Sequence, residues 1–100
     1  MKQDNNINEL IHQPTRLKIM ALLSSLEEEI FVDFKFLLDE LSLTEGNLSI
    51  HLQKLEAAEF IQIKKEFLNK KPKTFINITK NGRAEFENYL NELESIIKRK

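Results

Sequence analysis

The chain has 100 residues, 41% of them hydrophobic and 31% charged, and a formal net charge of −1. This length and composition predict one globular domain with a modest core and are not those of a disordered chain. The absence of cysteine excludes a disulfide framework and a thiolate metal site, and no apolar run approaches the ~18 residues of a membrane span. The first residues also lack the apolar core of a signal peptide, so we expect a cytoplasmic protein.

Positive charge is concentrated in one part of the chain. Residues 1–61 carry 5 Lys/Arg and 11 Asp/Glu, whereas residues 62–83 carry 7 basic residues and one acidic residue. A net charge of +6 over so short a stretch can bind phosphate even on a nearly neutral protein, because exposed charges more than ~8–10 Å away are largely screened. The alternative interpretation is a solvated lysine-rich hairpin without a ligand.

The first quarter of the chain predicts two helices. Residues 1–6 are polar and are expected to form a flexible N-terminus. Three apolar residues spaced over 7–11 predict a short helix. Pro14 suits the first position of a second helix, which extends to about residue 26 and is apolar on most sides. A helix this apolar is expected to be the buried centre of the domain, or to be partly buried against a second chain.

The next segment predicts a small strand followed by a helix-turn-helix unit over about residues 33–58. Residues 30–32 are strand formers, and Asp33 is a good N-cap for a helix over about residues 33–41. Thr44 can likewise cap the second helix of the unit, because its hydroxyl accepts a hydrogen bond from one of the first free N–H groups. Three residues at helical spacing then form an inward stripe: Leu48, Leu52 and Leu55.

The opposite side of this second helix is small and polar, as a helix that enters the major groove of DNA must be. That groove is only ~12 Å wide and offers hydrogen-bond donors, acceptors and thymine methyl groups. The candidate base-contacting residues are Thr44, Asn47, Ser49, Ile50, Gln53 and Lys54. The alternative is an ordinary amphipathic helix with a polar outer face. His51 lies on a flank and is a candidate phosphate contact or a partly buried hydrogen-bonding residue.

A β-hairpin with a basic tip is predicted over about residues 60–79. Residues 60–67 and 74–78 alternate with a period of two, and residues 68–73 are expected to form the tip. Pro72 fits the tip or an edge because it cannot donate to a ladder. The further candidate phosphate contacts are Lys64, Lys65, Lys70, Lys71 and Lys73 of this hairpin, and Arg16. For Arg16, a salt bridge to the acidic loop after the second helix is the alternative.

The last predicted helix covers about residues 80–97, with Thr79 as its cap. Its apolar stripe is broad for so small a domain and consists of Phe86, Tyr89, Leu90, Leu93, Ile96 and Ile97. One modest core is not expected to bury so much hydrophobic surface. The alternative is that the whole stripe packs on its own domain.

Several motifs in this order resemble a known family. The run GNLSIHLQKLEAAEFI at residues 46–61, with PTRLKI at residues 14–19 and ITKNGR at residues 78–83, is similar to winged helix-turn-helix regulators of the MarR and ArsR type. The resemblance covers about residues 7–97. One departure is Glu59, because the pattern usually has a glycine there that ends the recognition helix. We therefore expect an irregular or shifted helix end.

The resemblance implies an α+β, mostly helical fold: a winged helix-turn-helix with a three-helix core, a β-hairpin wing and a C-terminal dimerisation helix, in one domain over residues 7–100. It implies a sequence-specific regulator of transcription that binds double-stranded DNA as a homodimer on a near-palindromic operator, and it favours repression over activation. The six apolar residues of the last helix would then form the dimer interface. A small-molecule effector at that interface is left open, because it would change the spacing of the two recognition helices.

No pattern in the chain indicates an enzyme or a cofactor. With only two glycines there is no glycine-rich phosphate loop, and no nucleophile–base or metal-ligand spacing is present. Metal-sensing ArsR-type relatives use clusters of Cys, His and carboxylates, whereas this chain has no cysteine and two histidines on different predicted helices, so we expect no metal site. The alternative function is a winged-helix protein-interaction module or a non-specific DNA-binding component, which Glu45 and the acidic remainder of the chain favour.

Overall fold

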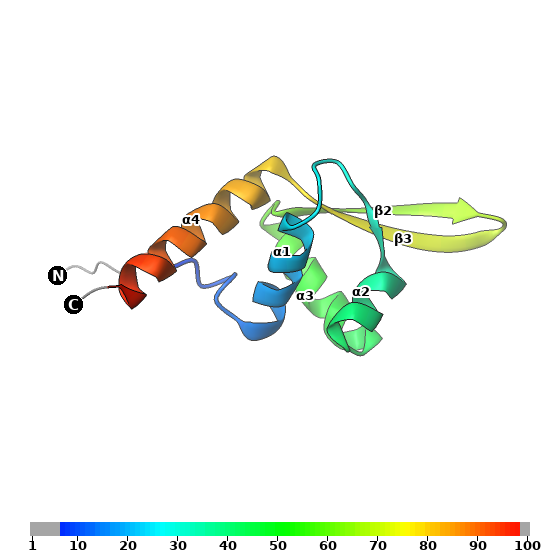
Figure 1. Ribbon diagram of the computed structural model, residues 1–100. Helices are drawn as coiled ribbons and strands as arrows, with labels where there is room; N and C mark the ends of the chain where they lie inside the picture. Colours follow the sequence, from blue (N-terminus) through cyan, green and yellow to red (C-terminus); the bar gives the residue numbers. More distant parts are fainter. Residues whose placement is uncertain (1–6, 99–100) are drawn as a thin grey trace.

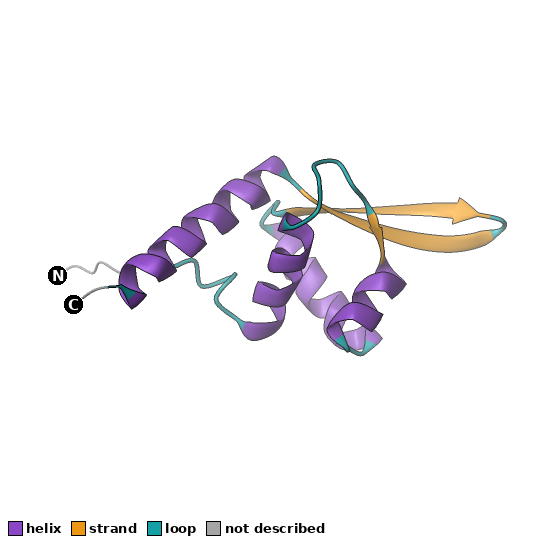
Figure 2. Ribbon diagram, viewed as in Figure 1, coloured by secondary structure: helices purple, strands orange, loops and turns teal. Residues whose placement is uncertain are grey.

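The computed structural model describes residues 7–98, which form four helices and one three-stranded antiparallel sheet (Figures 1 and 2). The elements are α1 (Pro14–Ser24), β1 (Val32–Asp33), α2 (Phe34–Leu41), α3 (Glu45–Ala57), β2 (Ile61–Leu68), β3 (Lys71–Ile78) and α4 (Lys80–Ile97). The helices α1, α2 and α3 form a compact body. The β2–β3 hairpin projects from one side of it and α4 from the other (Figure 1), and the overall extents are 56 × 25 × 21 Å. The predicted winged helix is therefore confirmed, and the expected flexible segment 1–6 lies outside the described residues.

The core lies between α1, α3 and the base of the sheet. As its nearly uniform apolar sequence predicts, α1 is central and contacts α2, α3, α4 and β3. Buried side chains come from every helix and from β2 and β3: Ile11, Ile19, Met20, Leu23, Leu37, Leu48, Leu52, Leu55, Phe60, Ile61, Ile76, Ile78, Phe86 and Tyr89. None of the helices in residues 7–98 is both long and apolar enough to span a membrane.

The helix predicted over residues 7–11 is wrong. This segment is a hydrogen-bonded turn in which the Asn8 side chain accepts from the Ile11 N–H at 3.1 Å and the Asn8 carbonyl accepts from the His12 N–H at 2.8 Å. An asparagine side chain that bonds nearby backbone competes with helix formation, and Pro14 starts α1 only two residues later. Ile11 is nevertheless completely buried. The apolar residues here fill the core from a turn.

The small edge strand is confirmed but lies two residues later than residues 30–32. β1 pairs with β3 through Val32↔Ile76 and Asp33↔Phe75, and the strand order is β1-β3-β2. The Ile30 carbonyl does not join the ladder because the buried Asn77 side chain donates to it at 2.7 Å. β1 then leads directly into α2, so the base of the hairpin and the helix-turn-helix unit are joined at one point.

The hairpin is longer than predicted. Its strands are paired from Ile61↔Ile78 to Leu68↔Lys71, and the turn has only two residues, Asn69 and Lys70, with φ of 53° and 65°. Two successive residues with positive φ are typical of the type I′ turn that suits a twisted hairpin. The prediction of a six-residue tip is therefore wrong. Pro72 lies in β3 opposite Phe67, beyond the part of β3 that pairs with β1. Its missing N–H therefore removes no hydrogen bond to β1.

Candidate nucleic-acid interface

Both ends of α3 are fixed by local hydrogen bonds. The Thr44 hydroxyl accepts from the Asn47 N–H at 3.2 Å, as predicted for its N-cap. At the other end the Glu59 N–H donates to the Glu56 carbonyl at 2.8 Å, and the Phe60 N–H donates to the Leu55 carbonyl at 3.0 Å. This pair of bonds is the Schellman arrangement, and Glu59 has the left-handed φ of 65° that glycine usually supplies there. The helix therefore ends regularly, and the expected irregularity is not found.

The side of α3 opposite the buried leucines is accessible. Ile50 is 54% exposed, Ser49 is half-buried, and the other four candidate base-contacting residues (Thr44, Asn47, Gln53 and Lys54) are exposed. We refer to these six residues as the base-contacting face. Its mixture of amide, hydroxyl, ammonium and methyl groups is the set that can contact base edges in a major groove.

A cleft of about 700 Å³ separates this helix from the wing. On the α3 side it is lined by Glu45, Ser49, Gln53 and Glu56, and on the wing side by Lys65 and Thr74. Successive residues of a strand point to opposite faces, so Lys65 shares the α3 side of the wing with Ile61 and Ile63. The base-contacting face and one basic residue of the wing thus lie on the same side of the molecule.

The wing lysines differ in their surroundings. The Lys64 ammonium lies 3.2 Å from the Glu66 carboxylate and 4.7 Å from the centre of the Phe31 ring. The Lys73 ammonium lies 3.6 Å from the Asp33 carboxylate, which also caps α2 by accepting from the Lys35 N–H at 2.9 Å. Both ammonium groups are therefore already partnered within the protein.

The other three wing lysines are better placed for phosphate. Lys65, Lys70 and Lys71 are exposed, and none of them has an ion pair within residues 7–98. Lys70 forms part of the turn and Lys71 follows it, so two of these charges lie at the tip. Fewer lysines are therefore available to bind a ligand than the number of basic residues in 62–83 indicates.

Arg16 and His51 lie together but are largely occupied. The Arg16 guanidinium is 3.0 Å from His51 Nδ1 and also donates through Nε to the Leu10 carbonyl. Burial, then the positive charges of Arg16 and Lys54, lower the pKa of His51 below its ordinary value, so the ring is neutral at pH 7 and can accept from Arg16. In the described part of the chain Arg16 makes no salt bridge to the acidic loop. This placement favours the hydrogen-bonding alternative for His51.

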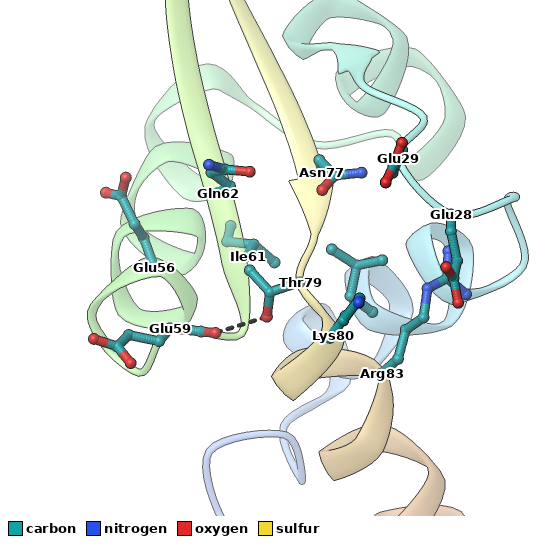
Figure 3. A pocket seen from close by; sticks show the side chains of 11 residues that line it. Glu28, Glu29, Glu56, Glu59, Ile61, Gln62, Asn77, Thr79, Lys80 and Arg83 are labelled. Atoms are coloured by element: carbon teal, nitrogen blue, oxygen red, sulfur yellow. Dashed lines mark hydrogen bonds between the residues drawn. The ribbon is translucent and has the colours of Figure 1, made fainter.

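Arg83 belongs to the basic stretch of the sequence but has a structural role. Its guanidinium donates to the Ser24 carbonyl at 3.0 Å and to the Leu26 carbonyl at 2.7 Å, which holds the loop after α1 against α4. Figure 3 shows it beside a cleft of about 450 Å³ whose lining includes four carboxylates. These acidic residues are Glu28, Glu29, Glu56 and Glu59. Within residues 7–98 no group of three or more His, Asp and Glu side chains is arranged to hold a metal ion.

The predicted dimer stripe of α4 divides into two parts. Phe86 and Tyr89 are buried in the core of the domain, and the Tyr89 hydroxyl lies 2.9 Å from His12 Nδ1. Leu93 is half-buried. The remaining three lie on the projecting helix and are exposed by 44%, 39% and 71%: Leu90, Ile96 and Ile97.

Two residues at this interface were not singled out from the sequence pattern as DNA contacts. Glu45 is the first residue of α3 and lines the cleft beside the base-contacting face. Phe67 belongs to the same period-two series as the buried Ile61 but is 75% exposed. Its exposure could have been predicted from the position of Phe67 near the hairpin tip, because a hairpin that continues past its last core residue exposes the residues that follow.

Comparison with known proteins gives a consistent result. A family model described as winged helix DNA-binding domain matches residues 15–97. An uncharacterized protein of Methanocaldococcus jannaschii is 40% identical over 89 residues, which cover 89% of this chain and 94% of that protein. The solved structure of a transcriptional regulator homologue from Pyrococcus horikoshii OT3 is 29% identical, with a TM-score of 0.80 and coverage of 90% of this chain and 86% of that chain.

A solved structure from Porphyromonas gingivalis W83, assigned to the MarR family of transcriptional regulators, has a TM-score of 0.71 at 12% identity and covers 100% of this chain and 99% of that one. The expected resemblance to regulators of the MarR and ArsR type is confirmed at the level of the fold. The chain belongs to the winged helix DNA-binding domain family.

Proposed function

We propose that this protein is a transcriptional regulator that binds specific double-stranded DNA as a homodimer and represses by occupying its operator. The observation that carries the proposal is that two residues of the base-contacting face of α3, Ser49 and Gln53, line one cleft together with the basic wing residue Lys65. Repression by occlusion needs only occupancy of the DNA, so it requires no surface beyond this one.

The base-contacting face offers chemistry for several bases. Gln53 and Asn47 can each bond adenine through two hydrogen bonds, Lys54 can bond guanine or a phosphate, and Ile50 can contact a thymine methyl group. All four are exposed and therefore need no rearrangement to reach a base edge. Lys65, Lys70 and Lys71 would contact phosphates and fix the register of the helix without selecting sequence.

The exposed apolar residues of α4 support a homodimer. Leu90, Ile96 and Ile97 belong to the C-terminal half of α4. This half extends away from the body (Figure 1), and a two-fold contact between two copies would cover it. Two recognition helices would then enter major grooves about one turn, ~10 bp, apart on a near-palindromic site. A small molecule bound between the subunits would change that spacing and release the DNA.

Sedimentation tests the dimer. The wild-type protein should sediment as a dimer at micromolar concentration, and a Leu90→Glu, Ile97→Glu variant should sediment as a folded monomer because two exposed side chains of the contact become charged. Lys18→Glu, an exposed change on α1, is the control for altered charge. A wild-type monomer at this concentration would refute the two-fold arrangement.

Fluorescence anisotropy tests DNA binding. The labelled probe is the duplex from upstream of the protein's own gene, beside a scrambled duplex of equal length, between 50 and 200 mM salt. A dimer that neutralises ~6–10 phosphates should lose about 10³–10⁵ in affinity over this range. Preference for the natural sequence together with this steep salt dependence is the expected result. Absence of binding to either duplex at the lowest salt would contradict the proposal.

The second candidate function is a protein-interaction module. The cleft at the start of α4 is lined by four carboxylates and two basic side chains, Lys80 and Arg83, and this excess of negative charge suits a basic protein segment better than DNA (Figure 3). This candidate becomes the leading one if both duplexes fail to bind.

A further inference from the structure

The tip of the wing combines apolar and basic side chains. Phe67 is 75% exposed, more than any other large hydrophobic residue described, and its cross-strand partner is Pro72. Lys70 and Lys71 lie within four residues of Phe67 in the chain, at the turn and at the start of β3. An exposed phenyl ring costs free energy in water, whereas the two ammonium groups, which have no ion pair within residues 7–98, are well hydrated. A ring and positive charges side by side suit a partner that is both anionic and able to stack on an aromatic ring.

The strand register places Phe67 on the α3 side of the wing. Paired residues lie on the same face of a sheet, and residues two apart along a strand share that face. Ile63 and Lys65 precede Phe67 in this series, and Lys65 lines the cleft shared with α3. Leu68, which is 44% exposed, belongs to the opposite face. Phe67 therefore lies on the side of the wing that a DNA duplex held by α3 would occupy.

The length of the wing matches the spacing between grooves. The last hairpin pair that packs on the core is Ile63↔Ile76, and five further residues of β2 lead to its end at Leu68. At ~3.3 Å per residue the wing extends ~17 Å beyond the core. Half of a ~34 Å turn of duplex is also ~17 Å, so a wing beside a helix in the major groove reaches the adjacent minor groove.

We propose that Phe67 enters the minor groove as an apolar wedge, partly unstacks one base step and bends the duplex away from the wing. This inference rests on the proposed DNA binding and adds to it a deformation and a source of specificity. Phenylalanine is one of the side chains that proteins insert in this way, with bends of about 20–90° toward the major groove. Pyrimidine–purine steps such as TA and CA open most readily, so the wedge selects for such a step at a position that α3 does not contact.

The other occupant of an exposed apolar tip would be a second copy of the chain. The tip and α4 project from opposite sides of the body (Figure 1), so a dimer formed through α4 leaves Phe67 free. The charge at the tip is also uniformly positive, which disfavours contact between two identical tips and favours a polyanion.

The experiment uses a duplex that the wild-type protein enriches from a pool of random sequences, labelled at both ends for energy transfer. The fluorescent adenine analogue 2-aminopurine replaces adenine at one base step at a time, and its fluorescence increases when base stacking is lost. The variants are Phe67→Ala and Phe67→Leu, with Leu68→Ala as the matched control, because that residue is an exposed apolar group at the same tip on the opposite face. Thermal unfolding of every variant confirms that the fold is retained.

The expected result is a bent duplex in which 2-aminopurine fluorescence increases at one base step, about half a turn from the site of the recognition helix. Phe67→Ala should abolish the bend and the brightening and weaken binding by ~10-fold, the order expected for loss of one stacked aromatic group. Phe67→Leu should retain most of the bend, and Leu68→Ala all of it. The wedge would be refuted if the wild-type protein neither bent the duplex nor raised the 2-aminopurine fluorescence, or if Phe67→Ala bent the duplex equally. Neither outcome would contradict DNA binding. Failure to enrich any duplex would refute DNA binding itself, and a changed sedimentation coefficient for Phe67→Ala would assign the residue to a subunit contact instead.

Discussion

The two glycines of the chain should respond in opposite ways to the same substitution. Gly82 is the third residue of α4 and is buried, and a Cβ added to it would lie 2.0 Å from the Phe60 carbonyl oxygen and 2.9 Å from the Phe60 carbonyl carbon. Gly46 is the second residue of α3, and a Cβ there would have no atom within 4 Å. Alanine at Gly46 therefore fits without change, whereas alanine at Gly82 must push backbone aside.

The size of the effect at Gly82 follows from what Phe60 does. Its carbonyl accepts from the Thr79 N–H at 3.0 Å and from the Thr79 hydroxyl at 3.1 Å, which joins the start of α4 to the start of β2. Overpacking costs about 1–3 kcal/mol, and each of the two hydrogen bonds contributes about 0.5–1.5 kcal/mol. The helix gains only about 0.5–1 kcal/mol when glycine becomes alanine. Gly82→Ala should therefore lower the free energy of unfolding by about 2–4 kcal/mol.

Urea and thermal unfolding, followed by circular dichroism without DNA, measure both variants. Gly82→Ala should lower the melting temperature by at least ~8 °C, since each kcal/mol corresponds to about 4–8 °C for a domain of this size. Gly46→Ala should raise the free energy of unfolding by about 0.5–1 kcal/mol and serves as the control for helix propensity. Equal stabilisation by both substitutions would refute the close approach of α4 to β2.

Four further substitutions test the α3 terminus, His51 and the wing. Glu59→Gly should raise the free energy of unfolding by about 1 kcal/mol, measured in urea, because glycine takes the left-handed φ of 65° without penalty. The folded state lowers the pKa of His51, so its contribution is complete above about pH 6.5 and is lost as pH falls through the folded-state pKa. His51→Gln should flatten this part of the pH profile of unfolding. Lys71→Ala should reduce the slope of log affinity against log salt concentration by about one per subunit. Lys73→Ala should reduce this slope less, because the Lys73 ammonium is already paired with Asp33.

Each of these expectations can be contradicted directly. A neutral or destabilising Glu59→Gly would mean that the carboxylate itself stabilises the helix end. An unchanged pH profile for His51→Gln would place the acid sensitivity elsewhere. Equal loss of salt dependence for both lysine variants would mean that the carboxylate partner of Lys73 does not hold it away from DNA.

Local signals in the sequence were sufficient for most of the elements and for the N-caps of α3 and α4. Thr44 and Thr79 cap α3 and α4 as predicted, because capping depends on a side chain and backbone groups only a few residues away. The inward leucines of α3 were predictable because buried residues must recur with the helical period. The turn at residues 7–11 was not, because five residues are too few to separate a helical spacing of apolar groups from a turn that fills the same core.

The roles of the charged residues could not be predicted from local sequence signals. Lys73 pairs with Asp33, and Arg83 donates to two loop carbonyls more than fifty residues away. A backbone carbonyl has no signature in the sequence, so an arginine that binds one cannot be distinguished from an arginine that binds phosphate. The internal partners of the candidate phosphate contacts Lys64, Lys73 and Arg16 could therefore not be predicted. The strand alternation did place Lys65 on the same face as Ile63.

Asp33 joins the wing to the helix-turn-helix unit, and under the proposed function this connection would affect how well the protein distinguishes DNA sequences. Asp33 ends β1, pairs with Phe75 of β3, caps α2 and binds Lys73. One residue thus connects the sheet, the first helix of the helix-turn-helix unit and the wing. A hairpin that moved freely would still bring positive charge to phosphate, but only a wing held at a fixed angle requires a particular groove spacing and a deformable step at a defined distance. If the protein binds specific DNA as proposed, its specificity depends as much on the contacts that fix the wing as on the side chains that contact bases.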